Sequence, residues 1–149
     1  MVRPNKDEIT FLTSKGVIEI SKNGGFDTYS VYLERYYIGS ILRSGDFSHQ
    51  NEDNPIFNKK EKQLLIDIAY KRITPKSLIK PMPLSVNSER WSVERYTKRK
   101  YRVKSIQDAD VGFIWQEIIK GRLMWVSDRI DAGILSQIAP QMLTLIKKT

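Results

Sequence analysis

The sequence contains no cysteine among its 149 residues. It therefore offers no disulfide framework and no thiolate for a zinc site, an iron–sulfur cluster or nucleophilic catalysis. Long apolar runs are also missing: no stretch approaches the roughly 20 residues that span a bilayer, and the N-terminal stretch lacks the apolar segment of a signal peptide. These absences predict a cytoplasmic protein with no membrane partner.

The residues that are present give the composition of an ordinary globular chain. Hydrophobic residues make up 40% and charged residues 28%, far from the low hydrophobicity and high charge of disordered chains. A chain of this length can bury roughly two-thirds of the surface that its unfolded form exposes. We find no internal repeat, low-complexity tract or long linker, so we expect residues 1–149 to form a single domain. The oligomeric state stays open.

Positive charge is distributed unevenly along the chain. The sequence has 25 Lys and Arg against 17 Asp and Glu, a net charge of +8. Residues 59–104 hold fourteen of the basic residues and only four acids, so this segment alone accounts for the excess. A phosphate backbone favours such a segment, because each neutralised phosphate releases condensed counterions. The alternative is a solvated surface whose charge serves solubility.

The segment from residue 16 to residue 43 has the pattern of strands, with apolar and polar residues alternating at a period of two. A tight turn is expected at Glu34 and Arg35. The expected strands cover residues 17–20, 29–33 and 36–42. We predict that they form a three-stranded antiparallel meander, followed by a polar loop over residues 46–58.

The first helix is expected from about Asn58 to Arg72, because apolar residues recur there at helical spacing. Asn58 is the expected cap, and Thr74 and Pro75 end the helix. The next stretch is proline-rich and extended. Between residues 91 and 106 the alternation favours two strands around a turn at Lys98 and Arg99, although some of the apolar spacing also fits a helix.

The end of the chain is expected to be helical. One helix begins at Asp108 or Asp110 and ends near Gly121, and a second begins at Ser127 or Asp128. Pro140 can open a further short helix. The expected apolar stripes consist of Val111, Ile114, Trp115, Ile118 and Ile119, then of Ile130, Ile134, Leu135 and Ile138, and finally of Leu143 and Ile146. The predicted fold class is therefore α+β, with an N-terminal three-stranded antiparallel sheet, one helix, a basic middle segment containing a possible hairpin, and two or three C-terminal helices.

Cationic and aromatic side chains are interleaved in the basic middle segment. Lys and Arg neutralise phosphates, while aromatic faces stack on exposed bases at about 1–3 kcal/mol per base. The candidate nucleic-acid-binding residues are Arg90, Arg95, Lys98, Arg99, Lys100, Arg102, Lys104, Tyr96 and Tyr101. Trp91 lies beside them, but its alternation with Val93 favours a position in the core. The competing interpretation is that the rings are core residues and the charges a solvated face.

Catalytic and metal-binding motifs fail on spacing. Asp46, His49, Glu52 and Asp53 could be drawn as a hard-cation site, but they lack the spacing of an EF-hand loop. Glu19 and Lys22 are three residues apart on a predicted strand and therefore point to opposite faces. We expect no catalytic residue, no metal and no cofactor.

The sequence thus favours a non-catalytic nucleic-acid-binding protein, with DNA slightly preferred over RNA as its ligand. Two other classes stay open: a small divalent-metal-dependent nuclease or ribonuclease toxin, and a protein–protein adaptor that binds an acidic partner. Divalent-dependent cleavage would indicate the nuclease. Protein binding without salt-dependent affinity for nucleic acid would indicate the adaptor.

Overall fold

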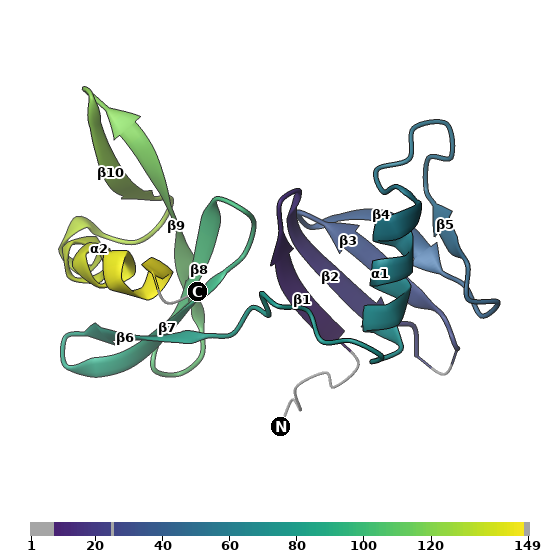
Figure 1. The fold of residues 1–149 in the computed structure, drawn as a ribbon. Coiled ribbons are helices and arrows are strands. Elements are labelled where there is room, and N and C mark those ends of the chain that lie inside the picture. Colours follow the sequence, from purple (N-terminus) through teal and green to yellow (C-terminus); the bar gives the residue numbers. More distant parts are fainter. Residues whose placement is uncertain (1–7, 25, 148–149) are drawn as a thin grey trace. The chain divides into compact units, whose positions relative to one another are not determined.

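The computed structural model describes residues 8–24 and 26–147. The chain divides into two compact units, Met1–Leu78 and Ile79–Thr149. Each unit contains a five-stranded antiparallel sheet, with strands in sequential order, followed by one helix (Figure 1). Most of the N-terminal stretch, in which the sequence predicts no signal peptide, lies outside the described residues. The expectation that residues 1–149 form a single domain stays a prediction.

The N-terminal unit is a meander in which each strand pairs with the next. Its strands are β1 (Glu8–Thr13), β2 (Gly16–Lys22), β3 (Tyr29–Leu33), β4 (Tyr36–Ile41) and β5 (Phe47–His49). Glu34 and Arg35 connect β3 to β4 with φ angles of 51° and 73°, as a tight hairpin turn requires. The predicted meander is therefore confirmed as the centre of this sheet, and β1 and β5 extend it on both sides.

Helix α1 (Lys59–Ala69) covers one face of this sheet. Asn58 caps it as predicted: its side chain accepts a hydrogen bond from the Glu61 N–H, and the Glu61 carboxylate accepts one from the Asn58 N–H, 2.9 Å each. The helix ends earlier than expected, because Lys71 already has a φ of 61°. Leu65, Ile66, Ile68 and Ala69 pack into the core with Phe11, Ile18, Ile20, Val31 and Ile41.

The C-terminal unit repeats this order of elements. Its strands are β6 (Met82–Val86), β7 (Glu89–Arg95), β8 (Lys100–Lys104), β9 (Asp110–Ile119) and β10 (Arg122–Ser127). Helix α2 (Ala132–Lys147) lies on one sheet face, where Ile138 and Met142 are fully buried. They pack in one cluster with Leu84, Val86, Val93, Tyr101, Val103 and Ile114.

The predicted fold class is wrong. The described residues are mostly β, in two five-stranded antiparallel sheets with two helices, instead of one three-stranded sheet with two or three C-terminal helices. The basic middle segment includes the strands β7 and β8. Its hairpin is confirmed, because β7 and β8 pair antiparallel from Ser92 opposite Lys104 to Arg95 opposite Tyr101.

The prediction of a helix after Asp108 or Asp110 is wrong, because this segment forms the hairpin of β9 and β10. Asp108 lies in a turn with a φ of 59°. β-branched and aromatic residues dominate β9, and such residues favour a pleated strand. Lys120 and Gly121 then reverse the chain with φ angles of 50° and 77°, as the tight turns of hairpins do.

The last two helices predicted from the sequence form a single helix, α2, in the structure. The cap is Asp131, whose carboxylate accepts a hydrogen bond from the Ile134 N–H at 2.9 Å, and not Ser127 or Asp128. Asp128 instead accepts a hydrogen bond from the Phe113 N–H at 2.9 Å, which links the segment before α2 to β9. Pro140 lies inside α2 and does not start a new helix. The buried residues Ile138 and Met142 on either side of it provide packing that offsets the lost backbone hydrogen bond.

Candidate nucleic-acid interface

The two faces of the C-terminal sheet differ in what they carry. Residues directly opposite each other on neighbouring strands project from the same face. Val93 is opposite Val103, and both belong to the core under α2. Arg102, one position along β8, is opposite Glu94 on β7 and Phe113 on β9. These three residues therefore lie on the face that α2 does not cover, which we call the aromatic–basic face and define as Glu94, Tyr96, Lys100, Arg102, Phe113 and Trp115.

Three half-buried rings on this face lie next to cations. The rings of Tyr96 and Phe113 are in contact, with centroids 4.7 Å apart. The Arg102 guanidinium lies 5.4 Å from the Tyr96 ring centroid, and the Lys100 Nζ lies 5.0 Å from that of Trp115. The Trp115 Nε1–H donates to the Glu117 carboxylate at 2.8 Å, which orients the indole. The face thus combines partly exposed π surfaces with positive charge.

Arg102 is the best-anchored cation of the face. It forms an ion pair with Glu94, and its Nε lies 3.8 Å from the Asp110 carboxylate. Burial by itself would lower the pKa of Arg102, but the hydrogen bond and charge of Glu94, together with the charge of Asp110, outweigh it and raise the pKa. Arg102 therefore holds the face together and has part of its charge neutralised.

The remaining predicted cations differ in how they are paired. Lys104 lies 3.7 Å from the Asp108 carboxylate at an exposed position. Arg90 and Arg99 are exposed and form no ion pair within the described residues. Lys98 and Arg99 lie in the turn between β7 and β8, beside Lys100. The structure therefore brings most of the predicted cations to the aromatic–basic face or to its adjoining turn.

Two predicted binding residues lie elsewhere. Tyr101 is only 5% exposed and packs edge-on against Trp125, with ring centroids 5.8 Å apart. Burial raises the pKa of its hydroxyl. Arg95 lies over the Tyr101 ring at 4.8 Å and donates to the Lys98 carbonyl. The Tyr101 ring is therefore not accessible to a base in this structure. Trp91 packs against the same core, as its alternation with Val93 predicts.

Phe113 and Trp115 are missing from the residues chosen from the sequence. The sequence pattern predicts Trp115 on the apolar stripe of a helix, whereas the structure places it on strand β9. The signal was present, because Val111, Phe113 and Trp115 alternate with Gly112 and Ile114 at a period of two. In the structure that alternation separates the half-exposed rings from the buried Ile114.

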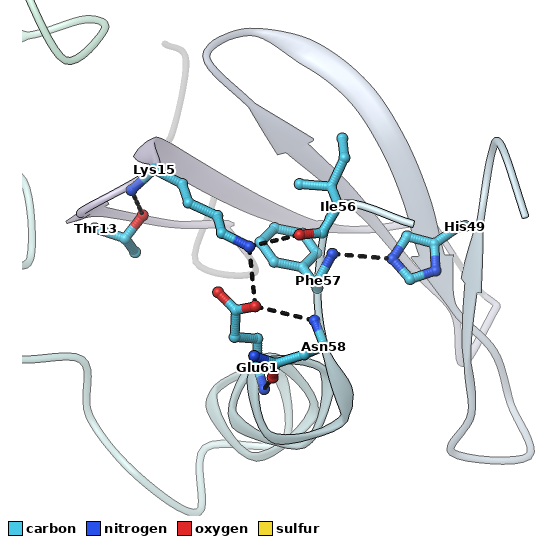
Figure 2. Close-up of polar contacts among 7 residues, drawn as sticks. All are labelled: Thr13, Lys15, His49, Ile56, Phe57, Asn58 and Glu61. Carbon is cyan, nitrogen blue, oxygen red and sulfur yellow. Dashed lines mark hydrogen bonds and ion pairs between the residues drawn. The ribbon is translucent and has the colours of Figure 1, made fainter. Parts of the chain in front are cut away.

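The histidine of the N-terminal unit is buried among aromatic rings. His49 is 5% exposed, and its ring centroid lies 4.8 Å from that of Phe47. Its Nε2 accepts a hydrogen bond from the Phe57 N–H at 3.4 Å (Figure 2). Burial, followed by the charge of Lys62, lowers the pKa of His49 against the opposing effect of Glu52. Within the part of the chain that the structure describes, no three metal-ligating side chains come together.

Lys15 ties the loop before α1 to the first hairpin of the N-terminal unit. Its Nζ donates to the Ile56 carbonyl at 2.5 Å and to the Glu61 carboxylate at 2.9 Å (Figure 2). It also lies 5.2 Å from the centre of the Phe57 ring. On β2, Glu19 forms an ion pair with Arg35 at 2.9 Å. These contacts make Lys15 with Glu61, and Glu19 with Arg35, structural ion pairs.

Comparison with protein families, with curated proteins and with solved structures gives no significant match. For residues 8–24 and 26–147, no helix has both the length and the apolar character that crossing a membrane requires.

Proposed function

We propose that this chain is a non-catalytic nucleic-acid-binding protein that holds a single strand on its aromatic–basic face. The observation that supports the proposal is the grouping of Tyr96, Phe113 and Trp115 with Lys100 and Arg102 on a sheet face that α2 leaves uncovered. Sheet faces that bind single strands combine the same two components, rings that stack on bases and cations that follow the backbone.

Single strands fit this face better than a continuous duplex. The rings are grouped on an open sheet face, and a ring can stack only on a base whose flat surface is exposed. In a duplex the bases offer a protein their edges in the grooves. A single strand can turn its bases out toward the sheet. DNA is the first ligand to test, in line with the sequence analysis, and RNA is the second.

The charge of the two units also supports the C-terminal unit as the binding unit. Residues 79–149 carry thirteen Lys and Arg against seven Asp and Glu, whereas residues 1–78 carry twelve against ten. The positive excess is therefore concentrated in the unit that has the aromatic–basic face. A polyanion gains affinity from that excess through counterion release. We place this activity in the cytoplasm.

The test is a titration of fluorescently labelled single-stranded DNA, single-stranded RNA and duplex DNA at several salt concentrations, with and without Mg²⁺. We expect single strands to bind more tightly than the duplex, with affinity that falls steeply as salt rises. The ligand should remain intact when Mg²⁺ is present. Absence of salt-dependent binding to all three ligands would refute the proposal and favour the adaptor, and Mg²⁺-dependent cleavage would favour the nuclease.

A further inference from the structure

Strands β9 and β10 project from the C-terminal sheet as a two-stranded ribbon (Figure 1). β8 pairs with β9 only as far as Trp115, whereas β10 pairs with β9 from Ile114 to Ile119. Beyond Trp115 the ribbon therefore has no third strand beside it within the sheet. Lys120 and Gly121 form the turn at its tip.

Apolar side chains are exposed on both faces of this ribbon tip. Ile118 is 76% exposed and Leu123, directly opposite it on β10, is 64% exposed. Ile119 and Met124, on the other face, are 37% and 46% exposed. Only one residue further along β10, Trp125 packs against Tyr101 in the core. Exposed apolar clusters of this kind mark interaction sites.

The charge around the tip favours a polyanion as its partner. Lys120 lies in the turn, and Arg122 is opposite Ile119. Beyond Trp115 the ribbon carries one acid, Glu117, which accepts the hydrogen bond from Trp115, against the two cations Lys120 and Arg122. The tip therefore offers four apolar side chains flanked by two cations, a combination that fits a ligand with a flat apolar surface within a chain of negative charges.

We propose that the ribbon tip packs against the terminal base pair of a duplex, so that the preferred ligand is a junction between a single strand and a duplex. This inference rests on the proposed function, because the single strand lies on the aromatic–basic face. A base pair exposes its flat surface only where the stack ends or opens. Ile, Leu and Met are among the side chains that proteins insert at opened base steps.

The position of the tip supports one continuous binding surface. Trp115 belongs to the aromatic–basic face and Ile119 is four residues further along the same strand, which corresponds to about 13 Å. Both side chains project from the same face of the ribbon, because they are an even number of residues apart. An anionic lipid surface shares the apolar and negative chemistry. The nucleic acid is favoured because the tip continues a face that carries stacking rings.

The experiment compares three labelled DNA ligands that share one strand: the single strand, a blunt duplex, and a duplex with a single-stranded tail. The full chain is titrated with each ligand at one salt concentration and compared with the double variant Ile119→Ser, Met124→Ser, which changes the two apolar residues on the ribbon face that carries Trp115. Both positions are solvent-exposed, so the fold should persist, and thermal melting checks this. Leu143→Ser is the matched control, because Leu143 is an apolar residue of α2 with 57% exposure.

The wild-type chain should bind the tailed duplex roughly tenfold more tightly than the single strand, which is within the range for one stacked base. The double variant should lose this preference while keeping its affinity for the single strand, and Leu143→Ser should keep both. Equal wild-type affinity for tailed duplex and single strand would overturn the inference and leave the proposed function intact. Loss of both affinities in the double variant would also overturn it. Failure of the single strand to bind at all would refute the proposed function itself.

Vesicles containing phosphatidylglycerol provide the test of the lipid alternative. We expect the wild-type chain and the double variant to sediment with these vesicles to the same small extent. Vesicle binding that depends on Ile119 and Met124, without any preference for the tailed duplex, would overturn the inference in favour of a lipid surface.

Discussion

The N-terminal and C-terminal units have the same order of five strands and a helix, yet their uncovered sheet faces differ in chemistry. In the N-terminal unit that face carries Tyr32 and Tyr37, with ring centroids 5.8 Å apart, and the ion pair of Glu19 with Arg35. In the C-terminal unit it carries cations beside half-exposed rings. The comparison shows that the same order of elements can carry different chemistry on its open face, so a function has to be argued from the side chains on that face.

The largest expected effect concerns the two cores, which share no residue. Ile138→Ala should destabilise the C-terminal unit by about 2–5 kcal/mol, because this side chain is fully buried. Ile68→Ala, at a position that is 1% exposed, should do the same to the N-terminal unit. We expect hydrogen exchange to show each loss of protection confined to the mutated unit. Equal loss in both units would support the single domain predicted from the sequence.

Local signals explain what could be predicted of the fold. Three correctly predicted features depend on residues close in sequence. They are the turn at Glu34 and Arg35, the cap at Asn58 and the hairpin around Lys98 and Arg99. Short-range propensity and turn chemistry act in the same direction as the final packing at these places. The first and last strands of the N-terminal sheet had weaker alternation and were missed.

The ribbon shows why the C-terminal prediction failed. Val111, Ile114, Trp115, Ile118 and Ile119 fit the spacing of a helix, but that stripe assumed that all five residues enter one core. In the structure Ile114 is fully buried, while Ile118 is 76% exposed on the ribbon. From the sequence alone, apolar residues that are exposed on the surface cannot be distinguished from apolar residues that are buried in a core. Because of the same error, the predicted site lacks Phe113 and Trp115.

The second prediction tests the difference between the two open faces directly. Trp115→Ala should weaken binding of single-stranded DNA by roughly 1–3 kcal/mol, the usual contribution of one stacked base. Tyr37→Ala, which removes a 41% exposed ring from the open face of the other unit, should leave the affinity unchanged. Fluorescence anisotropy measures both. Equal losses would show that binding is not confined to the C-terminal unit.

The third prediction concerns the salt dependence of binding. Replacing Lys98, Arg99 and Lys100 together by Ala should reduce the slope of log affinity against log salt by about two to three units, as expected for lost phosphate contacts. The matched control replaces three exposed lysines of the N-terminal unit, Lys59, Lys60 and Lys76. We expect the control to keep the wild-type slope. An unchanged slope in the first variant would exclude the turn between β7 and β8 from the interface.

The smallest expected effect is a pH dependence of stability in the N-terminal unit alone, because His49 is the one histidine of the chain and belongs to that unit. Its pKa in the folded protein is lowered by burial and by Lys62, whereas an unfolded histidine titrates near its ordinary value of about 6.5. Between these two values the unfolded chain binds more protons than the folded chain. The stability that neutral His49 provides is therefore complete above pH ~6.5 and is lost as the pH falls through the lower, folded value.

Thermal unfolding followed by Phe57 and its neighbours in NMR spectra should show this loss in the N-terminal unit as the pH is lowered from 7 to about 5, which is below the ordinary histidine pKa. His49→Gln retains a side-chain acceptor for the Phe57 N–H but does not titrate, so it should remove the pH dependence in this range. The C-terminal unit, monitored through Trp115, should melt at the same temperature throughout. A wild-type N-terminal unit that is equally stable at both pH values would show that its histidine environment does not distinguish the charged from the neutral ring.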